Sequence, residues 1–142
     1  FGLAAVVGTV WVQVLAAPPA AWLGGVCMGL LATAILVVNN LRDRVTDAAA
    51  NKRTLAVRFG PRVARWEHSL AIAAPFAVVA GGATTGWIPT ASAALTVLAL
   101  PLAVREIRCV RMLDGPALNP HLGGAARLEL VFGLLFSVGF FL

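Results

Sequence analysis

Two long stretches of this sequence contain no charged residue, Phe1–Leu41 and Ser69–Val104. As a helix, the first stretch would extend roughly 60 Å, about twice the thickness of the hydrocarbon core of a bilayer. Charged residues make up 12% of the 142 residues, against about 25% in soluble domains, and the mean hydropathy is +0.89. A chain with so little polar surface is predicted to be an integral membrane protein rather than a soluble enzyme.

Each charge-free stretch is long enough for two membrane spans and contains one turn signal. The signals lie at residues 17–20 and 85–89, where Pro removes a backbone donor and Gly relaxes the backbone. The apolar runs lack the alternation of barrel strands, and in lipid only helices or closed barrels satisfy the backbone. The sequence therefore predicts an all-α, polytopic transmembrane bundle with five helices here. We expect them at about 1–17, 20–38, 68–86, 88–104 and 125–142.

The basic residues behind the formal net charge of +5 lie in two connections, 39–67 and 105–124, or, for Arg127, just after the second, and the two turns carry no charge. By the positive-inside rule, both basic loops are expected in the cytoplasm, with the chain in the cell inner or plasma membrane. The basic residues do not form a groove-binding face, so no nucleic-acid partner is expected. Those in and just after the second connection are expected to anchor it at the lipid surface, with a substrate-phosphate role as the less favoured alternative: Arg105, Arg108, Arg111 and Arg127.

The cysteine and histidine residues give no metal-binding or disulfide pattern. Cys27 lies in a predicted span and Cys109 in a predicted loop, so we expect two reduced thiols. His68 and His121 are isolated in the sequence. Trp66 is expected at the cytoplasmic boundary of the membrane, where aromatic residues form a belt.

A polar stripe follows the second predicted span directly. If the helix continues, Asn39, Asp43 and Asp47 have i, i+4, i+8 spacing and lie within a stripe of about 80°, roughly 6 Å apart. Mg²⁺ usually takes one or two carboxylates together with waters and phosphate oxygens. The stripe is thus one wall of a magnesium site. The spacing alone leaves open that both aspartates only solvate a helix end among counter-charges.

Basic residues next to this stripe are suited to a phosphate-bearing substrate. Lys52 and Arg53, with Arg42, Arg44 and Arg58 nearby, can neutralise a diphosphate that a metal ion does not fully cover.

This segment resembles a known motif. Asn39-Asn40-Leu41-Arg42-Asp43, then Asp47, then the run 52–60 are similar to the second aspartate-rich motif of the UbiA superfamily of intramembrane prenyltransferases. Residues 118–120 and 132–135 are similar to the last loop and helix of that family. One departure is Asn51, where the family often has Gly. Asn tolerates a left-handed backbone better than other non-Gly residues, so the turn is expected to be kept.

The resemblance implies a bundle of nine helices with two aspartate motifs, of which this chain matches the last five helices. The first motif is then expected upstream, in a missing N-terminal half of the same chain. An isolated C-terminal half is expected to be inactive, because it would hold only half of the metal ligands.

The run 52–60 most resembles the branch that prenylates 1,4-dihydroxy-2-naphthoate. This implies an Mg²⁺-dependent transfer of a polyprenyl group from polyprenyl diphosphate to that acceptor, in contact with membrane lipid, giving demethylmenaquinone in menaquinone biosynthesis. The resemblance implies that Asp43, Asp47 and Asn39 hold Mg²⁺. It implies that Asp43, Asp47 and Lys52 are catalytic. The residues that it implies in diphosphate binding are Lys52, Arg53, Arg42, Asn39 and Asn40.

Two alternatives remain at this stage. Another branch of the superfamily would use 4-hydroxybenzoate, a chlorophyllide or a haem as acceptor. A multi-pass transporter or assembly subunit is less favoured. The spans of transporters usually carry ionisable groups or broken helices near the middle of the membrane, whereas the predicted spans of this chain carry no charge there. Pro75 and Gly81-Gly82 are the positions where a helix of this chain is most open to a break.

Overall fold

In the computed structural model, which describes all residues 1–142, the chain is helical throughout and contains no β-strand. This confirms the predicted all-α class. Two 3₁₀ turns, Val97–Ala99 and Gly115–Leu118, adjoin α6 and α7. The helices are α1 (Gly2–Val14), α2 (Pro19–Arg42), α3 (Arg44–Ala49), α4 (Leu55–Thr84), α5 (Thr90–Thr96), α6 (Leu100–Met112) and α7 (Asn119–Val138).

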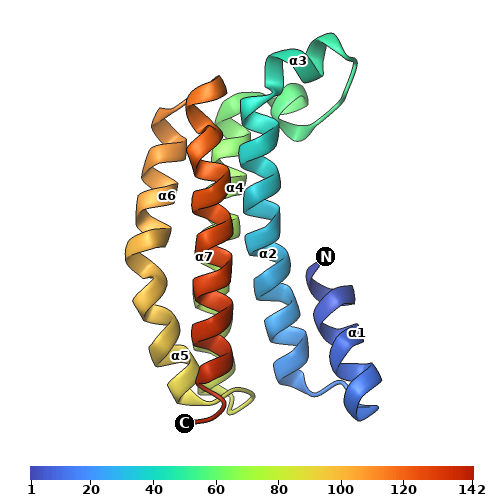
Figure 1. Cartoon of the computed structure of the whole chain (residues 1–142), viewed down its shortest axis with the longest axis vertical. Helices are drawn as coiled ribbons and strands as arrows, with labels where there is room; N and C mark the ends of the chain where they lie inside the picture. Colours follow the sequence, from blue (N-terminus) through green and yellow to red (C-terminus); the bar gives the residue numbers. More distant parts are fainter.

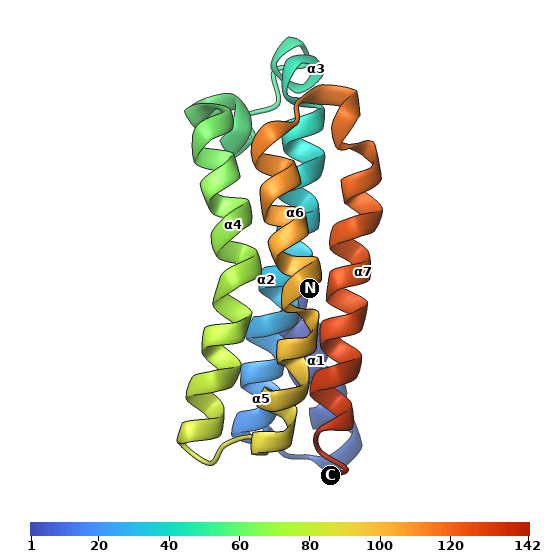
Figure 2. The same cartoon turned by 90° about the vertical axis from the view of Figure 1, so that its left-hand side faces the viewer.

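The long helices run side by side along one axis (Figures 1 and 2). α2 packs against α4 and α7, and α6 packs against both α4 and α7, which closes a bundle around a common core. α5 leads through its 3₁₀ turn into α6 as one rod, whereas α1 packs on α2 at the margin (Figure 1). The short helix α3 covers one end of the bundle, which we call the α3 end.

The core consists of two clusters of buried apolar side chains. The larger includes Leu31, Ile72 and Phe132, and Phe132 meets Phe76 edge to face with ring centroids 5.2 Å apart. The smaller cluster includes Val110 and packs α2, α4 and α6 together near the α3 end. Buried apolar side chains therefore pack together even near the α3 end, where the helices also carry polar residues.

The helices extend further at the α3 end than the sequence predicts. Residues 39–67 and 105–124, expected as loops, are largely helical: α2 continues to Arg42, α4 begins at Leu55 and α6 continues to Met112. The expected boundaries are wrong here because they follow the loss of overall hydropathy. One face of each helix still buries apolar side chains after polar residues have appeared on the other faces.

One sharp change of direction occurs within α4, at Gly60. Its φ of 83° and ψ of 170° lie outside the helical region, in a range that L-residues with a side chain rarely adopt. Pro61 follows and begins a new helical segment without needing a hydrogen-bonded N–H. Beyond it the helix continues past Pro75 and through Gly81-Gly82 to Thr84, so it is unbroken at the positions that were most open to a break.

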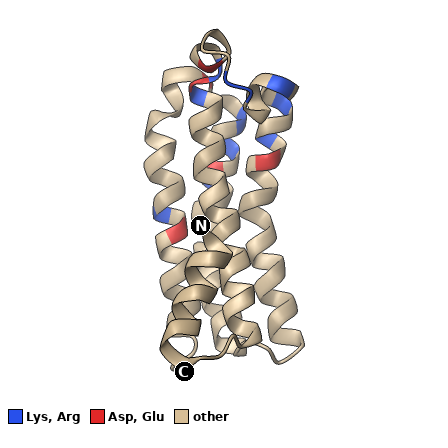
Figure 3. Cartoon of the chain, turned by 90° about the vertical axis from the view of Figure 1, so that its right-hand side faces the viewer, with Lys and Arg blue, Asp and Glu red and all other residues tan.

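The charged side chains are distributed unevenly along the bundle. Lys and Arg gather toward the α3 end, and the end that holds the α1–α2 and α4–α5 turns carries none (Figure 3). By length and composition, α2 and the segment Gly115–Val138 each meet the requirement for crossing a bilayer. Chemistry that involves charged groups is therefore confined to one end and its approach.

Candidate active site at the α3 end

The predicted polar stripe lies where α2 passes into α3. Asp43 ends α2 and begins α3, with φ of −93° and ψ of 8°. Its N–H donates to the Asn39 carbonyl (3.0 Å), and the Asp47 N–H donates to the Asp43 carbonyl (2.8 Å). The three residues therefore keep helical hydrogen-bond spacing, although the helix axis changes between them.

Arg42 occupies the centre of this site. Its guanidinium donates to both carboxylate oxygens of Asp43, with Nε–Oδ1 at 2.7 Å and Nη2–Oδ2 at 2.6 Å. It also donates to the Oδ1 atoms of Asn39 (2.8 Å) and Asn119 (3.3 Å). Two-point pairing of guanidinium and carboxylate is strong and directional. Arg42 thereby connects the end of α2 to the first residue of α7.

This pairing fixes the charge of Asp43. The hydrogen bond from Arg42 holds the pKa of the Asp43 carboxyl below its usual range. Both side chains retain access to water, with exposed fractions of 34% for Asp43 and 25% for Arg42. Asp43 is therefore a carboxylate at neutral pH and is accessible from solution.

Asp47 forms the second charge pair. Its Oδ1 lies 3.0 Å from Lys52 Nζ, and its side chain is 7% exposed, whereas that of Lys52 is 67% exposed. Asn51, between them, has φ of 56°, which confirms the expected left-handed turn. The turn brings the Lys52 N–H to 2.9 Å from the Asp47 carbonyl, so the backbone and the side chain of Lys52 both contact Asp47.

The structure does not bring together all of the predicted site residues. Asn40 is half-buried and Arg53 is exposed, and neither side chain makes a hydrogen bond or an ion pair. No group of three or more His, Cys, Asp or Glu side chains is placed to hold a metal. Two carboxylates and the Asn39 amide oxygen nevertheless fit the oxygen donors that a hard divalent cation prefers. In this structure the Asn39 oxygen and both Asp43 oxygens accept hydrogen bonds from Arg42, and Asp47 Oδ1 accepts one from Lys52.

Sequence reasoning missed two polar contacts that involve α7. Asn119 is a hydrogen-bond partner of Arg42, and the only signal for it was its place in the 118–120 motif. His121, expected to be isolated, has its Nδ1 2.7 Å from Glu106 Oε2. Glu106 occupies a buried position of α6 between Ala103 and Val110 at helical spacing, and an acid at such a position requires a partner.

The two cysteines and the other histidine take no part in these contacts. Cys27 and Cys109 are free thiols, as expected. His68 is fully buried, and neither of its ring nitrogens has a hydrogen-bond partner.

The structure is a helical membrane bundle with paired carboxylates and basic side chains at one end. Comparison with known proteins shows the family to which a bundle of this class belongs. The model of the UbiA prenyltransferase family matches residues 1–117. The chain belongs to the UbiA prenyltransferase family, a family of polytopic membrane proteins that generally use a divalent metal.

Curated relatives share one described activity. The chain is 38% identical to the 1,4-dihydroxy-2-naphthoate octaprenyltransferase of Escherichia coli and 37% identical to that of Haemophilus influenzae, with 100% and 98% of the chain covered. The protein of the same description from Mycobacterium leprae is 39% identical over 94% of the chain. The chain spans about half the length of these relatives, 45–46% in each case. No solved structure matches the chain.

Proposed function

We propose that this chain forms the C-terminal half of an enzyme that transfers a polyprenyl group from polyprenyl diphosphate to 1,4-dihydroxy-2-naphthoate, giving demethylmenaquinol, the reduced dihydroxy form of demethylmenaquinone. The observation that carries the proposal is the pair of carboxylates, Asp43 and Asp47, each in contact with a basic side chain of the same motif. The names of the relatives support the acceptor, and their length supports a need for an N-terminal half.

In this reaction the bond between the allylic carbon and the diphosphate oxygen breaks, and a bond from that carbon to the naphthalene ring forms. The ring loses its carboxyl group as CO₂. Negative charge develops on the leaving diphosphate, and groups that stabilise it only as it develops accelerate the step. Bulk water must be excluded while the allylic carbon is electrophilic, which suits a site at the end of an apolar bundle.

Asp43, Asp47 and Asn39 would hold the divalent metal, which we propose is Mg²⁺. Its contribution when bound is neutralisation of the diphosphate charge. Arg42 keeps Asp43 ionised and oriented through its two-point contact. In the present geometry its donors already serve Asp43, Asn39 and Asn119, so we assign it a positioning role in addition to the expected diphosphate contact.

Lys52 and Arg53 would bind the diphosphate. The Lys52 ammonium is largely exposed and touches Asp47 through one carboxylate oxygen, so it can contact Asp47 and a phosphate oxygen together. Arg53 is exposed and has no competing partner. Asn40, which makes no side-chain hydrogen bond in the structure, is the least supported member of the proposed diphosphate-binding set.

We further propose that the α3 end faces the cytoplasm in a cell inner or plasma membrane. The concentration of Lys and Arg at this end and their absence from the other support this orientation (Figure 3).

The proposed function is tested with the complete enzyme in membranes, supplied with polyprenyl diphosphate, Mg²⁺ and either 1,4-dihydroxy-2-naphthoate or 4-hydroxybenzoate. We expect transfer to the naphthoate only. Asp43→Asn and Asp47→Asn should each lower kcat by roughly 10²–10³-fold, the usual effect of removing a main electrostatic contact. Asp114→Asn is the matched control, because Asp114 is 67% exposed and pairs with Arg65 instead. Transfer to 4-hydroxybenzoate alone would assign the chain to another branch of the family.

A further inference from the structure

A second basic site lies on the outer side of the bundle, between α4 and α6. It is a hollow of about 260 Å³, lined by Arg62, Arg65, Trp66 and Arg111. None of these residues belongs to the proposed active site. The proposed prenyl transfer therefore gives this hollow no role.

Arg65 fixes the wall of the hollow. Its Nε donates to the Val110 carbonyl (3.2 Å) and its Nη2 to the Leu113 carbonyl (3.0 Å), at the C-terminal end of α6. Nη2 also lies 2.8 Å from Asp114 Oδ1. Most of the donor capacity of Arg65 is thus used within the protein, and its charge is partly balanced by Asp114.

The other two arginines are positioned with donors to spare. The Arg111 guanidinium lies 4.9 Å from the centroid of the Trp66 ring, and its Nε donates to Ser69 Oγ (3.2 Å). Its terminal nitrogens make no hydrogen bond within the chain. Arg62 is exposed and forms neither a hydrogen bond nor an ion pair. The hollow therefore presents two guanidinium groups with free N–H donors, one of them held against an aromatic ring.

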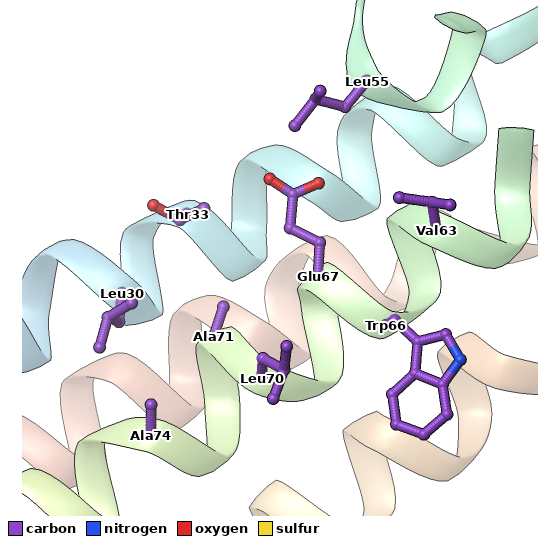
Figure 4. Close-up of a pocket in the computed structure, with 9 residues that line it drawn as sticks. All are labelled: Leu30, Thr33, Leu55, Val63, Trp66, Glu67, Leu70, Ala71 and Ala74. Atoms are coloured by element: carbon purple, nitrogen blue, oxygen red, sulfur yellow. The ribbon is translucent and has the colours of Figure 1, made fainter. Parts of the chain in front are cut away.

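An apolar groove adjoins this hollow and shares Trp66 with it. The groove, of about 530 Å³, runs between α2 and α4. Figure 4 shows the Trp66 ring directed away from α2, toward the neighbouring helix, while the Glu67 carboxylate points toward α2. Leu70 and Val63 in the groove are 62% and 47% exposed in this chain, so the groove is open to an apolar ligand.

We propose that the hollow binds the phosphate of an anionic phospholipid, with an acyl chain of the same lipid against the apolar groove. Guanidinium groups match phosphate oxygens in pairs, and basic pockets between transmembrane helices bind anionic head groups on the cytoplasmic side. Trp66 lies between the polar and the apolar part, as interfacial tryptophans do. A water-soluble phosphate would use the hollow but leave the groove unfilled.

The first test measures lipid binding by the complete protein in detergent, by native mass spectrometry with phosphatidylglycerol or phosphatidylcholine. We expect preferential retention of phosphatidylglycerol, weakened at least tenfold in Arg62→Ala/Arg111→Ala. The control Arg105→Ala/Arg127→Ala removes the same charge from two exposed arginines outside the hollow and should change binding less than twofold. Equal losses in the two variants, or none in the first, would overturn the proposal.

Two competitors distinguish the sources of phosphate. Inorganic phosphate at millimolar concentration should leave phosphatidylglycerol bound, and displacement would assign the hollow to a soluble anion. A rise in KM for polyprenyl diphosphate in Arg62→Ala/Arg111→Ala, with lipid binding unchanged, would assign it to the substrate instead.

A second measurement does not depend on the arginine variants folding. In bilayers of equal bromolipid content, brominated phosphatidylglycerol should quench the Trp66 emission more than brominated phosphatidylcholine. The Trp66 signal is the difference between the wild-type protein and Trp66→Phe. Equal quenching by the two lipids would contradict a specific anionic site.

Discussion

The Nδ1 atom of His121 and the Oε2 atom of Glu106 lie 2.7 Å apart inside the bundle, joining α7 to α6 across 15 residues of sequence. The side chains are 11% and 6% exposed. A polar pair so well shielded from water is costly to disrupt, because the remaining partner is left buried without a hydrogen bond. The pair therefore fixes how α6 and α7 pack.

Removing either partner should destabilise the complete protein. We expect Glu106→Ala and His121→Ala each to cost about 1–3 kcal/mol, the range for leaving a buried polar group without its hydrogen-bond partner. The double variant should cost less than the sum of the two, since it leaves no unpaired polar group. Reversible unfolding in mixed micelles measures all three free energies, and additive costs would show that the residues act independently.

Two adjacent glycines of α7 provide a sharper test of the same contact. A Cβ atom on Gly124 would lie 2.6 Å from Glu106 Oε2, whereas a Cβ on Gly123 would meet nothing within 4 Å. Gly124→Ala should therefore displace the Glu106 carboxylate from His121 and lower the melting temperature. Gly123→Ala should leave stability unchanged or raise it by up to about 1 kcal/mol, because Ala favours the helix. Similar melting temperatures for both variants would be inconsistent with the close packing at Gly124.

The Arg42–Asp43 pair predicts a pH dependence. Because the pKa of Asp43 is lowered in the folded protein, the pair contributes stability above the unfolded carboxyl value of about 3.9 and loses it as pH falls through the lower folded value. Because Asp43 stays ionised, its protonation should not change the metal affinity between about pH 5 and 8. In Arg42→Ala, a ¹³C carboxyl titration should show the Asp43 pKa moving upward. An unchanged value would mean that Arg42 does not control this carboxylate.

Lys52 is expected to have both a structural and a functional role. Its side chain is 67% exposed, but that of its partner Asp47 is only 7% exposed, so Lys52→Ala leaves a buried carboxylate without its ion-pair partner. Lys52→Ala should therefore lower the free energy of unfolding by about 1–3 kcal/mol. It should also raise the KM for polyprenyl diphosphate or lower kcat by at least roughly tenfold, since a charge-assisted contact to phosphate is lost. Arg44→Ala is the control, because it removes one positive charge from the same segment and Arg44 makes no ion pair. Equal kinetic effects of both variants would reduce the role of Lys52 to general charge.

The helical class can be predicted from the sequence, because the absence of charge over long runs is read directly along the chain. The left-handed backbone of Asn51 can be predicted as well, because it follows from local backbone sterics. Helix ends at Arg42 and Met112 were missed, since packing on one face continues after the average hydropathy falls. The contacts of Arg42 with Asn119 and of Glu106 with His121 were missed for a different reason: they depend on which helices become neighbours, which spacing within one helix does not encode.

The hydrogen bond from Arg42 to Asn119 spans 77 residues and bears on how the protein is made. During synthesis, α2 and the aspartate motif leave the ribosome well before the first residue of α7. Arg42 can pair with Asp43 at that stage, because the two are neighbours, but its contact with Asn119 forms only after the start of α7 has been synthesised. The end of the bundle that carries the reactive groups thus acquires its complete set of contacts later than its own local pairs.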